Sequence, residues 1–373
     1  MTFSIEGHFS VIRDPRQQSK IDYELLDILF LCVVAMICGA EAWNDIELVG
    51  NARLAWFQSK GFLLSGVPIS DTIARIISRL NPEEFRRCFI NWMASASKAT
   101  DGKIIPIDGK RLRGSYDNKK GLSAIHIVSA FAAENGVVLG QIKTAEKSNE
   151  ITAIPALIDL LDIKGCIVTI DAMGCQEAIA EKIISKKSDY VLAVKDNQKK
   201  LHDEIIDFFD CAKQHDFKHV SYDYFEETGK GHGRVETRRS WISNCLDTIA
   251  NPGKWAGLKT IGMVESERYI NGVTTIERRH YIASIKQNAE TFAHAVRAHW
   301  AIENKLHWVL DVTFKEDASR VRKDNGAENL GIVRHIALNI LRQDKNSKIS
   351  VKSRRYKATL EPEYANKILD GLF

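Results

Sequence analysis

The sequence predicts an α/β fold: a mixed five-stranded sheet with helices on both faces, an all-helical N-terminal segment and a β-rich insertion. Three observations lead to this prediction. Residues 1–98 show helical periodicity, residues 103–210 alternate short apolar strands with helices, and residues 218–285 alternate polar and apolar positions around an Asn-Gly turn. Hydrophobic residues make up 45% and charged residues 27% of the 373 positions, so we expect an ordinary globular chain of two or three domains.

The N-terminal segment, residues 1–98, is predicted to be helical throughout. The apolar stretch 28–40 should form a buried helix, and a later apolar stripe runs from Ile73 to Leu80. The same pattern exposes Arg75, Arg79, Arg86 and Arg87. Short helices with exposed arginines are typical of a helix-turn-helix DNA reader, and equally of a packed helical cap with solvated arginines.

The segment 99–215 supplies the sheet. Strands are predicted at 103–108, in a hairpin turned by Asn135-Gly136, at 166–171 and at 190–194, with helices after the third, fourth and fifth. A hairpin followed by alternating helix and strand gives a mixed sheet covered on both faces. Asp108 and Asp171 then end the first and fourth strands, at the edge where α/β sheets place their sites.

The rest of the chain divides by pattern into three parts. Residues 216–286 read as a β-rich insertion, residues 287–343 as helices that complete the core, and residues 344–373 as a basic tail with a short terminal helix. Together with 1–98 and 99–215, these are the expected segments.

Composition excludes several classes of protein. The seven cysteines are widely spaced, without a C-x-x-C pair, which argues against a zinc ribbon or a disulfide framework and favours a reducing cytoplasm. The stretch 28–40 is shorter than the ~20 residues that cross a bilayer, and the N-terminus lacks a secretory signal pattern. The glycines at 229–234 lack the P-loop spacing. We therefore expect no membrane and no nucleotide cofactor, while the net charge of +4 is compatible with an anionic partner.

Asp108 and Asp171 suggest a metal site. Either aspartate alone would more simply cap a turn, but carboxylates at neighbouring strand ends repel each other unless a cation lies between them. Mg²⁺, with Mn²⁺ as a substitute, prefers such oxygen ligands, and two ions ~3.5–4 Å apart support phosphoryl transfer. The cations that follow, Lys110, Arg111 and Arg113, would neutralise the phosphates of a nucleic acid.

A third acid is expected from the helix that follows the insertion. His299, Glu303, His307 and Asp311 recur every four residues and would share one helix face. Residues 299 and 311 are ~18 Å apart along the axis, so the four cannot bind one ion, and no H-E-x-x-H spacing supports zinc. Either Glu303 ligates a metal, oriented by its histidine neighbours, or the stripe packs against the sheet as hydrogen-bonded polar residues.

Long stretches around these acids carry a resemblance. Asp108 lies in "PIDGKRLRGS", Asp171 in "VTIDAMGCQ" and Glu303 in "HWAIENKLHWVLDVTFKED". They resemble the acidic triad of insertion-sequence transposases with an RNase H-like catalytic core, and the H-repeat-associated group most of all. "EKSNEITAIPALIDLL", "YVLAVKDNQ" and "GKGHGRVETR" are also similar to this group. The resemblance covers essentially the whole chain.

The resemblance implies a metal-dependent DDE transposase that acts on double-stranded DNA. Such an enzyme cleaves at the terminal inverted repeats of its element and joins the freed 3′-hydroxyl to target DNA. It would be a bacterial cytoplasmic protein, associated with the nucleoid when DNA-bound, and a homodimer on paired ends. Two alternatives stay open: an RNase H-fold nuclease without strand transfer, and a domesticated, catalytically silent DNA-binding protein. The presence of all three acids argues against silence.

The surroundings of the glutamate depart from a common pattern. Many transposases with a β-rich insertion have Tyr, Arg and Lys at fixed distances from it, and this chain has Val296, His299 and Leu310 there. We expect Arg297, His299 and His307 to contact DNA or phosphate instead.

Two further segments are candidates for DNA contact. After the fifth strand, Lys195, Asn197 and Gln198 either meet DNA near the metals or cap the next helix. The basic run 345–357 would follow the DNA backbone. Its candidate residues are Lys352, Arg354 and Arg355.

Four acids compete to complete the triad. Glu303 is preferred because its helix begins soon after the insertion and its long side chain can reach a metal. Asp311 lies ~12 Å further along the axis and is rotated off that face. Glu316 and Asp317 are expected to lie beyond the turn of the helix from which a side chain could reach the metal.

Overall fold

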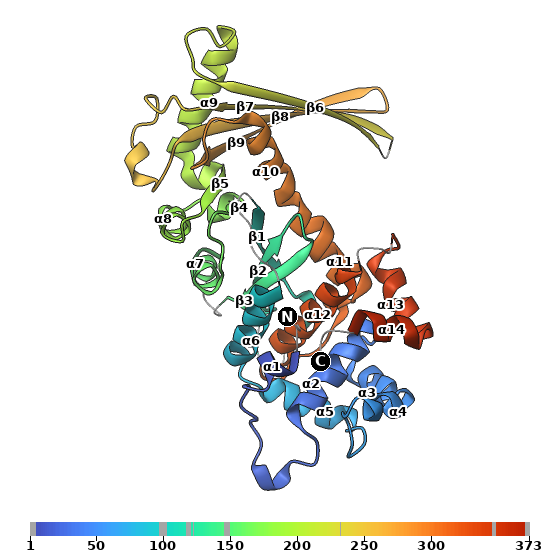
Figure 1. Cartoon of the computed structure of the whole chain (residues 1–373). Coiled ribbons are helices and arrows are strands. Elements are labelled where there is room, and N and C mark those ends of the chain that lie inside the picture. Colours follow the sequence, from blue (N-terminus) through green and yellow to red (C-terminus); the bar gives the residue numbers. More distant parts are fainter. Residues whose placement is uncertain are drawn as a thin grey trace.

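A computed structural model describes residues 5–96, 103–116, 121, 123–144, 150–231, 233–344 and 348–369. Nine strands form one sheet in the order β3-β2-β1-β4-β5-β9-β8-β7-β6 (Figure 1). The strands are β1 (Ile104–Arg111), β2 (His126–Ala132), β3 (Val137–Lys143), β4 (Ile167–Ile170), β5 (Asp189–Val194), β6 (Asp223–Gly231), β7 (Arg234–Ser243), β8 (Thr260–Ile270) and β9 (Val273–Ala283).

The first five strands confirm the predicted mixed sheet. β1 pairs antiparallel with β2 and parallel with β4, and β4 pairs parallel with β5. The prediction that the sheet ends there is wrong. β5 also pairs antiparallel with β9, so that Val194 lies opposite His280. An apolar, buried strand such as β5 cannot leave an edge unpaired without cost, and the insertion therefore extends the same sheet.

Helices cover both faces of the sheet. α7 (Glu150–Leu160), α8 (Glu177–Ser185) and α9 (Lys199–Gln214) follow β3, β4 and β5, as predicted. α10 (Ala289–Ala301) contacts β1, β4, β5, β6 and β7 along its length (Figure 1). Neighbouring residues of β1 point to opposite faces: Asp108 faces the helix that continues α10, whereas the backbone of Gly109 lies against Glu150 at the start of α7.

The helix expected to carry the third acid is not a regular α-helix. α10 continues through a π-helical segment, Ile302–His307, into α11 (Trp308–Thr313). Single π turns within α-helices are frequent at functional sites. α12 (Gly326–Gln343) follows and is buried along nearly all of its length.

The N-terminal helices share a core with the sheet. They are α1 (Ile5–Phe9), α2 (Leu25–Ile37), α3 (Trp43–Ala52), α4 (Leu54–Ser59), α5 (Ser70–Arg79) and α6 (Pro82–Ala96). The predicted stripe of α5 is buried, and α2 packs against α12 within one continuous apolar cluster that includes β1, β2 and β4. Three of the four predicted arginines are exposed, whereas Arg86 pairs with Glu328 of α12 at 3.5 Å.

The predicted basic tail instead contains a packed helix, α13 (Val351–Leu360), whereas the short terminal helix predicted after it is present as α14 (Pro362–Leu369). Residues 345–347 of that run lie outside the described residues. Arg355 of α13 is buried and donates to the carbonyl oxygens of Met36, Ala40 and Thr313. A cation at these helix C-termini satisfies carbonyls that have no partner within the helix. No described helix is both long and apolar enough to cross a membrane.

Candidate active site

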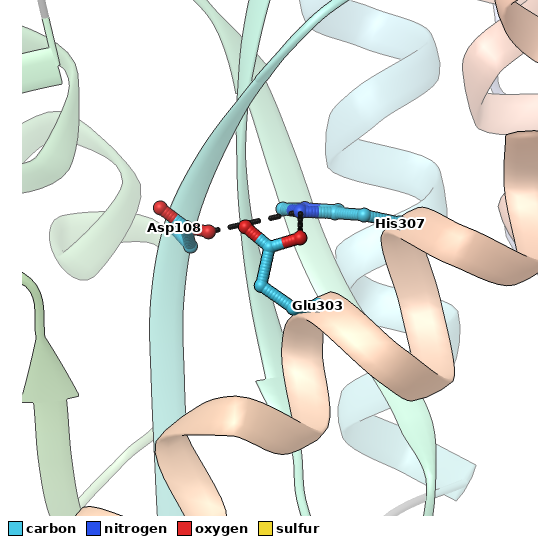
Figure 2. A group of neighbouring side chains, drawn as sticks. All are labelled: Asp108, Glu303 and His307. Atoms are coloured by element: carbon cyan, nitrogen blue, oxygen red, sulfur yellow. Dashed lines mark ion pairs between the residues drawn. The ribbon is translucent and has the colours of Figure 1, made fainter. Parts of the chain in front are cut away.

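Asp108 and Glu303 come together although they lie far apart in the sequence. Asp108 is on β1, and Glu303 is on the π-helical segment. The Nδ1 atom of His307, one helical turn further on, lies 3.5 Å from Glu303 Oε2 and 3.7 Å from Asp108 Oδ2 (Figure 2). Ligand atoms of these three residues all lie within 4.8 Å of one another. The backbone N–H of Gly109 donates to Asp108 Oδ1 at 2.8 Å, which leaves Oδ2 for this cluster.

The electrostatics of this pair favour a shared cation. Burial, and then the hydrogen bond and negative charge of Glu303, raise the pKa of Asp108 to about 8. The hydrogen bond with His307 lowers the pKa of Glu303 to about 2. Without a cation, the two carboxylates are therefore expected to hold one proton between them at neutral pH.

Asp171 approaches from the next strand and is held differently. It follows β4, and its Oδ1 accepts a hydrogen bond from the backbone N–H of Gly174 at 3.3 Å. Burial, and then the negative charge of Glu150, raise its pKa. Asp171, Asp108 and Glu303 line one cavity of about 460 Å³.

Histidines and basic residues line the same cavity. The Nδ1 atom of His299 lies 3.1 Å from Thr169 Oγ1 on β4, and burial lowers the pKa of His299 to about 4. His202 of α9 and His280 of β9 face each other, with Nε2 and Nδ1 3.2 Å apart. Lys195 also lines the cavity and is exposed. No ion pair of Lys195 occurs within the described residues.

A second cavity of about 360 Å³ lies between α10 and the outer strands. It shares Arg279 and Trp300 with the first cavity, and the guanidinium of Arg279 lies 5.0 Å from the Trp300 ring centre. Arg297 lines it and is exposed. The other arginines of its lining are Arg234, Arg238 and Arg268, facing Glu227 and Glu236.

The predicted phosphate contact of Lys110 needs correction. Its Nζ lies 2.5 Å from Asp311 Oδ1, 2.7 Å from Glu316 Oε2 and 3.6 Å from Asp317 Oδ1. Lys110 is a buried counter-ion that ties β1 to the segment after the π turn, and it neutralises the acids that competed with Glu303. Arg111 and Arg113 are exposed, and Arg113 lies 3.4 Å from Asp317 Oδ2.

Three other predicted DNA contacts also have internal partners. Asn197 Nδ2 donates to the carbonyl oxygen of Ala172 at 2.6 Å, and Gln198 Nε2 donates to that of Cys175 at 3.0 Å. Arg354 donates to the carbonyl oxygen of Leu341 at 2.7 Å.

Two more of the predicted contacts are buried. Arg355 is held by the three carbonyl groups named above, and His307 is buried with its Nδ1 atom within 4 Å of both carboxylates. Neither side chain is free to follow a DNA backbone. Lys352 is exposed.

Sequence reasoning did not identify the groups behind the acids. Glu150 Oε1 lies 2.9 Å from His126 Nε2, and a Cβ atom on Gly109 would lie 2.1 Å from that oxygen, so a larger residue beside Asp108 would have to displace the Glu150 side chain. His202 and His280 were also missed. Glu150 opens a helix that was predicted, and its position between the two aspartate-bearing strands is the signal that could have found it.

The sequence of this chain is similar to those of known proteins. Residues 7–93 match the DDE_Tnp_1-associated family, and residues 99–340 match the family described as transposase DDE domain. The chain is 47% identical over 370 residues to "Putative transposase YncI" of Escherichia coli O157:H7, covering 98% of this chain and 94% of that protein. It is 44% identical over 369 residues to "H repeat-associated putative transposase YhhI" of Escherichia coli strain K12, covering 98% and 97%.

One solved structure is distantly similar. It is a piggyBac transposase synaptic complex with hairpin DNA, with a TM-score of 0.46 and 12% identity, covering 100% of this chain and 82% of that chain. A structural similarity at this level establishes neither a family nor a function, and the two matches in sequence above are the relevant ones. The sequence matches cover nearly the whole chain and show that it belongs to the family of transposases with a DDE domain, with H repeat-associated transposases among its relatives.

Proposed function

We propose that this chain cleaves double-stranded DNA at the terminal inverted repeats of its element and transfers the freed 3′-hydroxyl to target DNA, with Mg²⁺ or Mn²⁺ as cofactor. The observation that carries the proposal is the meeting of Asp108, Asp171 and Glu303 at one cavity. Each comes from a different part of the sequence: Asp108 lies on β1, Asp171 directly follows β4, and Glu303 lies on the π-helical segment.

The residues fit a hard divalent cation. Asp108 and Glu303 place two carboxylates together in a partly buried cluster, and such groups repel each other unless a proton or a cation is shared. Bound Mg²⁺ or Mn²⁺ would polarise the phosphoryl group and activate the attacking oxygen. Asp108, Asp171 and Glu303 would hold the ions, and His307 would orient the Glu303 carboxylate.

Exposed basic residues offer a path for DNA. Lys195 is exposed and lines the first cavity, and Arg297 lines the second, which adjoins it. Arg111, Arg113 and Lys352 are also exposed. We infer that DNA phosphates meet these side chains, and that the N-terminal helices supply much of the recognition of element ends. His299 would act within the cavity, near the scissile phosphate.

The finer architecture is part of the same proposal. We infer an RNase H-like core made of 99–215 and 287–343, interrupted by the insertion 216–286 and flanked by 1–98 and 344–373. Two copies would hold paired ends. A nuclease without strand transfer is the second candidate, because the same acids support hydrolysis alone.

The test uses the full-length protein with labelled duplexes that carry the inverted repeats of its element. Asp108→Asn and Asp171→Asn should abolish cleavage and leave end binding near normal, because metal-held charge stabilisation is most of this catalysis. Full cleavage in excess EDTA contradicts the metal proposal. Cleavage without any joined product in the presence of target DNA favours the nuclease.

A further inference from the structure

We propose that Asn197 and Gln198 form a latch that positions Asp171 and thereby sets the affinity of one metal position; this rests on the proposed function. Both side chains belong to the turn between β5 and α9. Both reach across to the turn that follows β4, where Asp171 lies. In the sequence, the same residues are candidates for DNA contact.

The latch holds both ends of the Asp171 turn. Asn197 Nδ2 donates to the carbonyl oxygen of Ala172, at the start of the turn, at 2.6 Å. Gln198 Nε2 donates to the carbonyl oxygen of Cys175, at its end, at 3.0 Å. Between these two points lies Gly174, whose N–H donates to Asp171 Oδ1 at 3.3 Å. Movement of the turn therefore moves the group that orients the carboxylate.

The other side of the turn is fixed by packing on β4. A Cβ atom on Gly174 would lie 2.2 Å from Cγ2 of Ile170, so the backbone sits directly on that side chain. The turn is thus held between β4 and the latch. A single hydrogen bond to an exposed loop would leave it free to shift, but two side-chain amides from the turn after β5 define its position.

Asp171 depends on this support more than the other acids do. Asp108 and Glu303 are held by each other and by His307, all within 4.8 Å. Asp171 is not a member of that cluster, and its carboxylate is oriented by its own turn. Groups that orient a metal ligand in this way typically change metal affinity by about 10- to 100-fold when removed. Asn197 and Gln198 are positioning residues, because they act through Asp171.

The experiment measures Mn²⁺ binding to the full-length protein by the electron paramagnetic resonance signal of free Mn²⁺. Asn197→Ala and Gln198→Ala are compared with Lys199→Ala, a change at the next position, where the side chain is 75% exposed. Asp171→Asn and Glu303→Gln serve as references: the phase of the Mn²⁺ binding curve that each one loses is the phase that depends on that acid. We expect each latch variant to weaken the phase lost in Asp171→Asn by about 10-fold or more. The phase lost in Glu303→Gln should persist, and Lys199→Ala should match the wild type.

Cleavage kinetics give an independent reading. The Mn²⁺ concentration for half-maximal cleavage should rise in the latch variants, while the rate at saturating Mn²⁺ stays close to that of the wild type. Wild-type Mn²⁺ binding in both latch variants, with a phase lost in Asp171→Asn, overturns the latch and leaves the proposed function intact. A lowered melting temperature with unchanged Mn²⁺ binding also overturns it. Unchanged binding and cleavage in Asp171→Asn would instead overturn the proposed function.

Discussion

Replacing Lys110 with methionine should destabilise the fold. The Lys110 side chain is 11% exposed, and its closest fully enclosed partner, Glu316, is 3% exposed. Methionine fills a similar volume but leaves Arg334, at 3.6 Å, as the ion-pair partner of the Glu316 carboxylate within the described part of the chain. Removing one member of a buried ion pair costs about 3–5 kcal/mol. Asp311 and Asp317 keep contact with water, so their share is small.

The expected effect can be measured as a melting temperature. At roughly 2.1 cal/mol/K per residue, unfolding of a chain of this length has an entropy near ~0.8 kcal/mol/K, so the loss corresponds to about 4–6 °C. Although burial alone would raise it, the charges of Lys110 and Arg334 hold the pKa of Glu316 below its usual value. A carboxylate whose pKa is lower in the folded chain than in the unfolded chain stabilises the fold at pH values above its unfolded pKa. That stabilisation is lost as the carboxylate is protonated in acid. The defect of Lys110→Met should therefore be largest above about pH 5.

Two controls make the reasoning refutable. Arg113→Ala removes a cation whose side chain is 83% exposed and should change stability by less than about 1 kcal/mol. The double variant Lys110→Met/Glu316→Gln should regain part of the loss, because no carboxylate stays buried without its main partner. If Lys110→Met melts with the wild type, or the double variant is no better than the single, the buried counter-ion reading is wrong.

Three further predictions concern pH, packing and DNA. Because the pKa of Asp108 is raised to about 8, the folded chain retains a proton that the unfolded chain loses, so metal-free stability should fall from about pH 4 to about pH 8. Asp108→Asn should flatten that slope in a melting series; an unchanged slope contradicts it. Arg355→Met should cost about 2–4 kcal/mol, against ~0.5 kcal/mol or less for the exposed Lys352→Met; equal melting temperatures would refute the buried role. Arg297→Gln should weaken end binding and reduce the slope of log affinity against log salt by ~1, and an unchanged slope would remove Arg297 from the DNA path.

Local patterns were enough to predict the strands and the acids. Apolar runs, an Asn-Gly turn and alternating helices led to the first five strands and correctly put Asp171 at the end of the fourth, whereas β1 continues past Asp108 to Arg111. These features depend on residues close together in the sequence. The helical spacing of Glu303 and His307 likewise predicted neighbours, and the structure brings both to Asp108.

Long-range partners could not be predicted in the same way. Lys110 and Glu316 are 206 positions apart, and Arg355 and Met36 are 319 apart. A basic residue has the same local pattern whether it meets phosphate, a buried carboxylate or the end of a helix. The extension of the sheet also depends on such a pairing, since β5 pairs with β9, which is separated from it in the sequence by α9, β6, β7 and β8. For this reason the sequence predicted DNA contacts for basic residues such as Lys110 and Arg355, whose partners lie within the chain.

The most direct test of the account is which acid completes the triad. In a cleavage assay on end DNA with Mg²⁺, Glu303→Gln should be as inactive as Asp108→Asn, because Glu303 lies with Asp108 and His307. Asp311→Asn should retain measurable cleavage, because Asp311 pairs with Lys110 outside that cluster. Cleavage by Glu303→Gln together with loss of cleavage in Asp311→Asn would contradict the site proposed here.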